Sequence, residues 1–407
     1  MESINMKTTR PNATDIERNS RTTETDNASR DTSVRDTSVA LSLHNVRKDF
    51  GTTTAVDGIS LDVPAGAFLV LLGPSGCGKT TTLRMLAGLE NPTGGEIRFG
   101  DRVIARGDGS VVVPPADREA GLVFQSYALW PHKTVRANIE WPMKVAKWDK
   151  ADRAKRIDHV LDMLSITNLA NRYPGEISGG QQQRVAIARM IASKPTMLLF
   201  DEPLSNLDAK LRVDTRGELM RVHRSTGATS VYVTHDQVEA ITMATHIALM
   251  KDGRIEQFGT PRELLEKPAT AFAATFIGTP PANIIRSDVI QRRVVAFGVD
   301  CGVDVDSAPG LAHITDEVVQ TMYRAQSLTI TEDPHADGCI SAIFADQVAM
   351  VDRWVIGVIL PDDTRINIAQ NSPVDLRPGD KLGVYLPSEP DAVFDNSGQL
   401  ISFRERN

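Results

Sequence analysis

Eight residues near the start of the sequence have the types and spacing of a loop that binds phosphate groups. The segment Gly73-Pro-Ser-Gly-Cys-Gly-Lys-Thr80 follows the apolar run Phe68–Leu72, and a helical pattern begins at Lys79. Glycines let the backbone curl so that several N–H groups point at one anion, and the helix N-terminus adds partial positive charge. The spacing GxxxxGK[ST] between a strand and a helix predicts a nucleotide site. We expect Lys79 to reach the β- and γ-phosphates and the Thr80 hydroxyl to bind Mg²⁺.

Two adjacent carboxylates follow a second apolar run. Asp201 and Glu202 come directly after residues 196–200, which have the pattern of a buried strand. In open α/β sheets, ligands bind at the carboxyl ends of the strands. We expect Asp201 to hold Mg²⁺ through its water shell and Glu202 to polarise the water that attacks the γ-phosphate. Phosphoryl transfer depends mainly on positioning and charge stabilisation, so one oriented base and one metal ion suffice.

A third motif, Ile177-Ser-Gly-Gly-Gln181, precedes another helical pattern and offers a second anion site at a helix N-terminus. Here the sequence resembles the ATP-binding-cassette (ABC) family, whose signature is LSGGQ; Ile177 in place of leucine is the only departure. The resemblance implies a head-to-tail homodimer with two ATP molecules at its interface. In such a dimer, ATP held by one subunit contacts these residues of the other: Ser178, Gly179, Gly180 and Gln181.

The remaining motifs of the ABC family follow in the expected order. Gln125 matches the Q-loop, which contacts Mg²⁺ and moves with the permease, and Asp208 ends the D-loop at the dimer interface. His235 matches the switch histidine that contacts the γ-phosphate. Phe50 matches the aromatic residue that stacks on adenine, and we expect Val56 to pack beside the base. Alone, His235 and Phe50 would be more typical of structural roles, and their register with the other motifs favours function.

The candidate site residues fall into three sets. We expect catalysis from Glu202, His235, Lys79 and Gln125, and metal binding from Thr80, Gln125 and Asp201. Cys77 is interpreted as a small filling side chain, with an oxidation-sensitive thiol as the alternative. The expected ATP contacts are Phe50, Val56, Gly73, Pro74, Ser75, Gly76, Cys77, Gly78, Lys79, Thr80, Thr81, Ser178, Gly179, Gly180, Gln181 and Asp208.

The elements that must position these residues alternate along the chain. Helical periodicity begins at Lys79, recurs over 150–164 and follows Gly180. Strands of about 4–8 residues alternate with these helices, which predicts a parallel α/β sheet. The strand candidates are 39–46, 59–63, 68–72, 197–200, 229–234 and 246–250.

Changes in amino-acid composition and pattern divide the chain into three parts. Residues 1–38 are polar and nearly lack large apolar side chains, which predicts a disordered tail; Met1 and Met6 are both candidate starts. Residues 39–275 form the predicted ATP-binding domain, with a helical subdomain at about 127–180. In 276–407 short β-like runs are cut by turn signals. The predicted fold class is therefore an α/β P-loop NTPase of the ABC type, followed by an all-β domain, a small barrel or sandwich that resembles an OB fold.

Composition excludes several classes of protein. The net charge of −7 provides no global basic field, so we expect no nucleic-acid partner. Three dispersed cysteines favour a reducing cytosol over a disulfide framework or zinc site. No apolar run approaches the roughly 20 residues of a membrane helix. We therefore expect no membrane span in this sequence, and the resemblance to the ABC family implies a peripheral protein at the cytoplasmic face of the cell membrane, with a separate permease and an extracytoplasmic solute-binding protein as partners.

The β-rich part indicates an importer branch of the family. Residues 276–283 and 392–398 resemble the start and end of the C-terminal domain in maltose- and glycerol-phosphate-type importer ATPases. A sugar or sugar-like solute is therefore favoured. The additional segment 105–114 and residues 127–132 are instead similar to iron- and polyamine-type relatives, so ferric iron, a polyamine or another small solute remains an alternative. A further alternative is a soluble, non-transport ABC ATPase whose β domain binds nucleic acid or protein.

Overall fold

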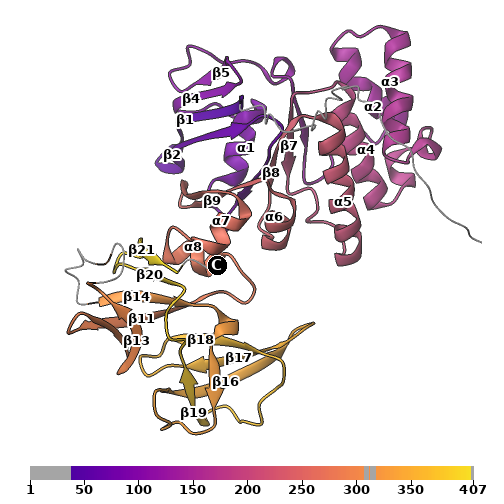
Figure 1. The fold of residues 1–407 in the computed structure, drawn as a ribbon. Helices are drawn as coiled ribbons and strands as arrows, with labels where there is room; N and C mark the ends of the chain where they lie inside the picture. The colour runs from indigo at the N-terminus through magenta and orange to yellow at the C-terminus, as the bar shows by residue number, and fades with distance from the viewer. Residues whose placement is uncertain (1–37, 307–310, 312–317, 405–407) are drawn as a thin grey trace, which may run out of the picture. The chain divides into compact units, whose positions relative to one another are not determined.

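The computed structural model describes residues 38–306, 311 and 318–404, so the predicted tail lies outside the described residues except for Ser38. The described chain begins with an α/β region and ends in a β-rich region (Figure 1). The predicted boundary at 275/276 stays a prediction. Among the described residues, no helix is both long and apolar enough to cross a membrane.

The larger sheet of the α/β region has six strands in the order β10-β9-β3-β8-β7-β6. Strands β9, β3, β8, β7 and β6 are parallel to one another, as predicted, and β10 is antiparallel to β9. The strands are β3 (Phe68–Leu72), β6 (Ala120–Val123), β7 (Met197–Asp201), β8 (Thr229–Val233), β9 (His246–Lys251) and β10 (Arg254–Gly259).

Strand β3 is buried on both faces, which explains its continuous apolar sequence. Phe68, Val70 and Leu72 belong to the core shared with helix α4 (Gly179–Ala192). The alternate residues Leu69 and Leu71 belong to the core shared with helix α1 (Lys79–Ala87). Because both faces of β3 are covered, the loop that follows it is held between two packed layers.

The first two strands correct a prediction. We expected strands at 39–46 and 59–63 within a parallel sheet, but β1 and β2 form an antiparallel hairpin of 12-residue strands in a separate sheet, ordered β2-β1-β4-β5. The reason is the short connection at Gly51, because parallel neighbours need a long crossover. The strands are β1 (Val39–Phe50), β2 (Thr53–Pro64), β4 (Gly94–Phe99) and β5 (Arg102–Arg106).

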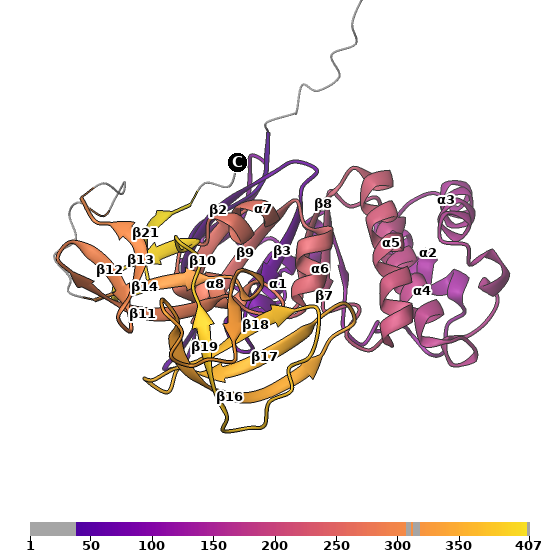
Figure 2. The ribbon, with the colours of Figure 1, turned by 60° about the horizontal axis from the view of Figure 1, so that its bottom comes forward.

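The three predicted helices are present as α1, α3 and α4, and other helices were not predicted. Helices α2, α3, α4 and α5 lie together beside the edge of the sheet that contains β6 and β7 (Figure 1, Figure 2). Helix α5 was missed because two of its four buried residues, Thr215 and His223, are polar, so the apolar periodicity is weak. The other helices are α2 (Val135–Val145), α3 (Lys150–Met163), α5 (Ala209–Thr226), α6 (Gln237–Met243), α7 (Pro261–Glu266) and α8 (Ala271–Phe276). Single 3-10 turns occur at Pro115–Asp117, Thr167–Leu169, Pro174–Glu176 and Ala325–Ser327.

One buried arginine ties the additional segment 105–114 to the helix that follows the phosphate-binding loop. Arg118 is 1 % exposed. Its Nε donates to the Val113 carbonyl at 2.7 Å, and its Nη1 donates to the carbonyls of Met85 and Leu86 at 2.5 and 3.1 Å. Burial lowers the pKa of Arg118 to about 10, so it stays cationic at neutral pH. A cation beside the last carbonyls of α1 stabilises that helix.

The described residues of the C-terminal part form two antiparallel sheets, ordered β13-β12-β11-β14-β20-β21 and β15-β19-β16-β17-β18. One apolar core includes Ile285 and Val319 from the first sheet and Val358 and Ile368 from the second. The predicted all-β class is confirmed. The strands are β11 (Asn283–Ile290), β12 (Arg293–Ala296), β13 (Val299–Asp304), β14 (Val318–Tyr323), β15 (Thr329–Thr331), β16 (Ile340–Ala349), β17 (Trp354–Ile359), β18 (Arg365–Gln370), β19 (Lys381–Tyr385), β20 (Ala392–Phe394) and β21 (Leu400–Phe403).

Candidate active site

The loop between β3 and α1 needs glycine at Gly73 and Gly78. Their φ angles are 151° and 99°, which side chains rarely adopt. A Cβ atom on Gly73 would lie 2.2 Å from the Met250 carbonyl oxygen, and one on Gly78 would lie 2.4 Å from the Ala55 carbonyl oxygen. The loop backbone therefore passes too close to neighbouring backbone for any side chain at these two positions.

We expect Gly73→Ala to lower the melting temperature and the ATP affinity more than Gly66→Ala does. Gly66 also has a positive φ, 70°, but its added Cβ would meet nothing within 4 Å. The control contains the strain of a left-handed residue, about 1 kcal/mol, while Gly73→Ala combines a backbone conformation essentially confined to glycine with a steric conflict of about 1–3 kcal/mol. Thermal unfolding and nucleotide titration measure both effects, and equal shifts for the two variants would contradict the steric argument.

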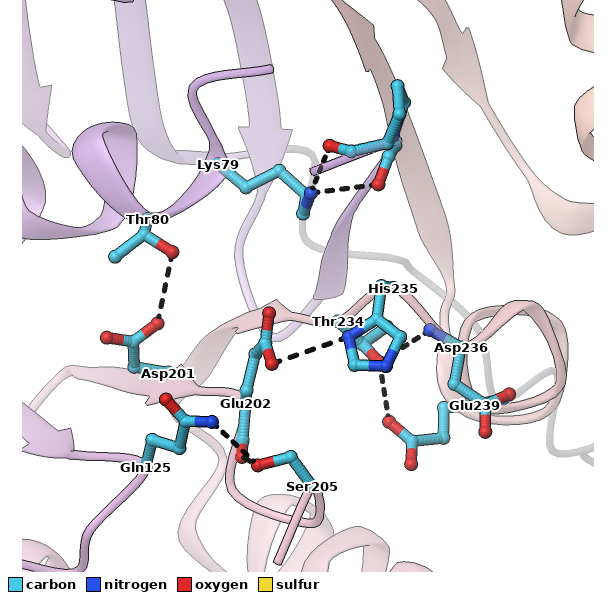
Figure 3. Close-up of polar contacts among 12 residues, drawn as sticks. Lys79, Thr80, Gln125, Asp201, Glu202, Ser205, Thr234, His235, Asp236 and Glu239 are labelled. Atoms are coloured by element: carbon cyan, nitrogen blue, oxygen red, sulfur yellow. Dashed lines mark hydrogen bonds and ion pairs between the residues drawn. The ribbon is translucent and has the colours of Figure 1, made fainter. Parts of the chain in front are cut away.

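Lys79 is buried within the loop at the start of α1. Its side chain turns back, and the Nζ atom donates to the carbonyl oxygens of Gly73 and Pro74, both at 2.8 Å (Figure 3). The Cys77 thiol is free, 3 % exposed, and its sulfur lies 3.6 Å from the same Nζ. The ammonium group is thus held by the loop in which the sequence places the phosphates.

Oxygen donors suited to Mg²⁺ meet between α1 and the end of β7. The Thr80 hydroxyl lies 3.4 Å from an Asp201 carboxylate oxygen (Figure 3). Burial raises the pKa of Asp201 and the charge of Glu202 raises it further, whereas Arg84 and Thr80 oppose the shift. The described residues contain no group of three or more His, Cys, Asp or Glu side chains arranged for a metal ion. Mg²⁺ ordinarily uses one or two carboxylates with phosphate oxygens and water, so this sparse donor set fits it.

Glu202 and His235 lie side by side although they come from different strands. The two neighbouring strands place Asp201 opposite Val233; Glu202 follows Asp201 directly, and His235 lies two residues after Val233. The Glu202 carboxylate lies 3.4 Å from His235 Nδ1 (Figure 3). Glu202 has a φ of 43°, and its backbone N–H donates to the Val233 carbonyl at 3.2 Å. Strained backbone of this kind is typical of functional sites.

Gln125 is connected to the segment that follows Glu202. Its amide Nε2 donates to the Ser205 hydroxyl at 3.1 Å, and that hydroxyl donates to the Glu202 carbonyl at 2.9 Å (Figure 3). The Asn206 side chain also donates to the Gln125 carbonyl at 3.0 Å. Because the amide nitrogen is used in this way, Gln125 would hold a metal ion through its amide oxygen. Sequence reasoning identified Gln125 but not its link through Ser205, for which spacing gives no signal.

The signature motif and Asp208 form two helix N-termini. Ser178 caps α4 by accepting from the Gln181 N–H at 3.4 Å, while the Gln181 side chain accepts from the Ser178 N–H at 3.0 Å. The Asp208 carboxylate caps α5 by accepting from the Leu211 N–H at 2.9 Å. Within the described residues no hydrogen bond joins this motif to the loop at 73–80. Its predicted contact with ATP of a second subunit stays a prediction.

The predicted adenine contacts differ in exposure. Phe50 is 48 % exposed, and the Lys48 Nζ lies 4.7 Å from its ring centroid. Val56 is fully buried, and a Cβ on Gly78 would lie 3.3 Å from its Cγ2 atom. The exposed ring of Phe50 is therefore accessible to a base, whereas the Val56 side chain packs against the phosphate-binding loop at Gly78. The stacking of Phe50 on adenine and the packing of Val56 beside the base remain predictions.

Comparisons with known proteins agree on one family. A model described as ABC transporter matches residues 56–205. The sn-glycerol-3-phosphate import ATP-binding protein UgpC of Cupriavidus necator is 50 % identical over 366 residues, which cover 86 % of this chain and 95 % of that protein. The trehalose/maltose import ATP-binding protein MalK of Thermococcus litoralis is 52 % identical over 256 residues, 63 % of this chain and 69 % of that protein.

A solved structure extends the similarity to the fold. The structure of cbiO1 from Clostridium perfringens, part of the ABC transporter complex cbiONQ, is 26 % identical with a TM-score of 0.50. The match covers 56 % of this chain and 90 % of that one. Together with the phosphate-binding loop and the carboxylates at the ends of its parallel strands, these similarities show that the chain belongs to the ABC transporter family, as one of its ATP-binding proteins.

Proposed function

We propose that the chain is the ATP-hydrolysing subunit of an ABC importer for a sugar or sugar-like solute. The near full-length similarity to the glycerol-3-phosphate import protein supports this class of solute. The similarity extends into the C-terminal β region of this chain. The alternative solutes suggested by residues 105–114 and 127–132, ferric iron or a polyamine, are tested in the same experiment.

Hydrolysis follows from the positions of three side chains. Lys79 neutralises charge on the β- and γ-phosphates. Glu202 orients a water molecule and accepts its proton as the water oxygen bonds to the γ-phosphorus. The bond between that phosphorus and the oxygen bridging to the β-phosphate breaks, and ADP and phosphate leave. His235, which is 3.4 Å from Glu202, donates a hydrogen bond to the γ-phosphate.

The metal site rests on Thr80, Asp201 and Gln125. Mg²⁺ bound there supplies positive charge to the β- and γ-phosphate oxygens. The Thr80 hydroxyl and the Asp201 carboxylate lie 3.4 Å apart, so these two groups could bind the same ion.

The chain works as a head-to-tail dimer at the cytoplasmic face of the membrane. Each signature motif faces the ATP of the other copy, so that ATP binds both halves of the closed interface. ATP therefore binds the closed dimer more tightly than the open one, and this difference in affinity shifts the population towards the closed dimer. Closure moves the separate permease, which receives its solute from an extracytoplasmic binding protein. Hydrolysis then reopens the dimer.

Residues 126–132 form the surface on which we place the permease. The segment is held firmly on the helices behind it, because the buried Arg189 donates to the carbonyls of Tyr127 and Ala128 at 2.8 and 2.6 Å. The Asn138 side chain also binds the backbone of Trp130, at 2.9 and 3.2 Å. A rigid segment adjoining Gln125 can transmit motion between a docked permease helix and the catalytic residues.

We expect Leu129→Asp to uncouple ATP hydrolysis from transport. Leu129 is partly buried against the helical core, and a carboxylate there would disfavour an apolar partner. The matched control is Leu89→Asp, at an apolar residue that is 47 % exposed and lies outside the segment. Co-purification with the permease and solute uptake are measured together with thermal stability. An intact, coupled complex with Leu129→Asp would show that the docking proposal is wrong.

Uptake of a labelled panel tests the function itself. The panel contains a disaccharide, glycerol 3-phosphate, ferric iron and a polyamine, supplied to cells that carry the wild-type chain or Lys79→Ala. Loss of uptake of the disaccharide or glycerol 3-phosphate in the variant is the expected result. Loss of iron or polyamine uptake instead would support the alternative solute class, and unchanged uptake of all four together with no permease co-purifying would reject the importer.

A further inference from the structure

A buried carboxylate that the hydrolysis mechanism does not use lies next to His235. Glu239, in helix α6, is 4 % exposed. One of its oxygens, Oε2, accepts from the Tyr232 hydroxyl at 2.8 Å and from the Thr234 hydroxyl at 2.7 Å. Burying a carboxylate is costly unless hydrogen bonds offset the lost hydration. Glu239 is thus held in one place by hydroxyl groups from the end of strand β8 and the residue that follows it.

The two hydroxyls keep their donor role at any ordinary pH. Burial raises the pKa of Tyr232 well above its usual value, and the neighbouring Glu239 and Asp236 raise it further. Tyr232 is fully buried, with its ring against Phe68 and Phe200 in the core of the sheet. It therefore anchors Glu239 to a rigid part of the molecule.

The hydrogen bonds of Thr234 also fix the backbone on both sides of His235. The Thr234 hydroxyl donates to Glu239 and also accepts from the Asp236 N–H at 3.0 Å (Figure 3). The Asp236 carboxylate caps α6 by accepting from the N–H groups of Val238 and Glu239 at 2.8 and 3.2 Å. The residues immediately before and after His235 are therefore tied to one another and to the first turn of α6.

His235 needs this support because its own side chain is poorly packed. Its side chain is 63 % exposed, and its Nδ1 atom lies 3.4 Å from the Glu202 carboxylate. An exposed ring is not oriented by neighbouring side chains, so its direction depends on the backbone that carries it. A displacement of about 1 Å at a catalytic group can lower a rate by about 100-fold.

We propose that Glu239, acting through the hydroxyl of Thr234, is a positioning residue that aims His235 at the γ-phosphate. This inference rests on the proposed catalytic role of His235. The bridge Tyr232–Glu239–Thr234 connects the sheet core to the His235 backbone. It contributes geometry and no proton transfer, so its loss lowers kcat for ATP hydrolysis and leaves ATP binding nearly unchanged.

The test compares Thr234→Val with Thr234→Ser in the full chain. Valine keeps the shape of threonine but removes the hydroxyl that connects Glu239 to the Asp236 N–H, whereas serine keeps that hydroxyl. We expect Thr234→Val to lower kcat by about tenfold with less than about a twofold change in the KM for ATP, and Thr234→Ser to restore most of kcat. Equal kcat for Thr234→Val and wild type would overturn the proposal.

A double variant separates positioning from independent structural damage. In a chain that already carries His235→Ala, adding Thr234→Val should lower kcat by less than about twofold further, because the aimed ring is gone. A further loss as large as in the wild-type background would show that Thr234 acts independently of His235. If His235→Ala hydrolyses ATP at the wild-type rate, the proposed catalytic role of His235 is wrong. If His235→Ala is impaired but Thr234→Val hydrolyses ATP at the wild-type rate, only the positioning inference is wrong.

Tyr232→Phe provides a second test of the proposal if Thr234→Val does not fold. It removes the other hydrogen bond to Glu239 and leaves the chain from 234 to 236 unaltered. We expect a drop in kcat of about threefold that disappears in the His235→Ala background. An unchanged kcat, or a drop that persists without His235, would contradict the bridge.

Discussion

Replacing Glu202 by glutamine is expected to lower kcat for ATP hydrolysis by about 100- to 1000-fold while ATP still binds. Glutamine keeps the size of the side chain and can still approach His235, but an amide cannot accept the proton of the attacking water. General bases contribute about 10²–10⁴ to enzymatic rates, which sets the size of the effect. Phosphate release at saturating ATP measures kcat, and nucleotide titration measures the affinity.

The same variant should accumulate the closed dimer. ATP bound at both halves of the interface stabilises the closed state, and slow hydrolysis removes the route back to the open one. Size-exclusion chromatography with ATP and Mg²⁺ should therefore show a dimer for Glu202→Gln and less dimer for the wild type. The control is Glu266→Gln, at a carboxylate on α7 that is 47 % exposed and pairs with Arg262. Wild-type hydrolysis by Glu202→Gln would show that the general-base assignment is wrong.

Lys79→Ala should weaken ATP binding by about 100-fold. Charge-assisted hydrogen bonds of the ammonium group contribute about 1.5–3 kcal/mol each, and about 2.7 kcal/mol corresponds to a 100-fold change in Kd. The variant also removes the donor to the Gly73 and Pro74 carbonyls, so we expect a small loss of thermal stability besides the loss of affinity.

A second lysine controls for the general effect of removing a positive charge. Lys144 pairs with Glu140 on helix α2 at 2.9 Å, outside the phosphate-binding loop. Lys144→Ala should leave the Kd for ATP within about twofold of wild type, because an exposed charge contributes little at a distance in salt. If a folded Lys79→Ala chain binds ATP as tightly as Lys144→Ala does, the role assigned to Lys79 must be abandoned.

Features that depend on a few consecutive residues could be predicted from the sequence. The conformation of the loop at 73–80 can be predicted from its glycines. Glycine is required where φ is positive and where two backbone segments approach closely, as at Gly73 and Gly78. The buried strands β3 and β7 and the helix α4 also have local apolar patterns, and the structure places them where the sequence predicts. The candidate residues at the ends of these elements could therefore be named in advance.

Pairings between distant segments were decided only by the tertiary structure. The hairpin of β1 and β2 pairs with β4 in a sheet separate from that of β3, and no local pattern specifies this partner. Gln125 meets Ser205 across 80 residues. Glu202 reaches His235 because β7 and β8 are neighbours with Asp201 opposite Val233. Strand order and register follow from burying both faces of one sheet at once, a property of the whole domain that no local pattern contains.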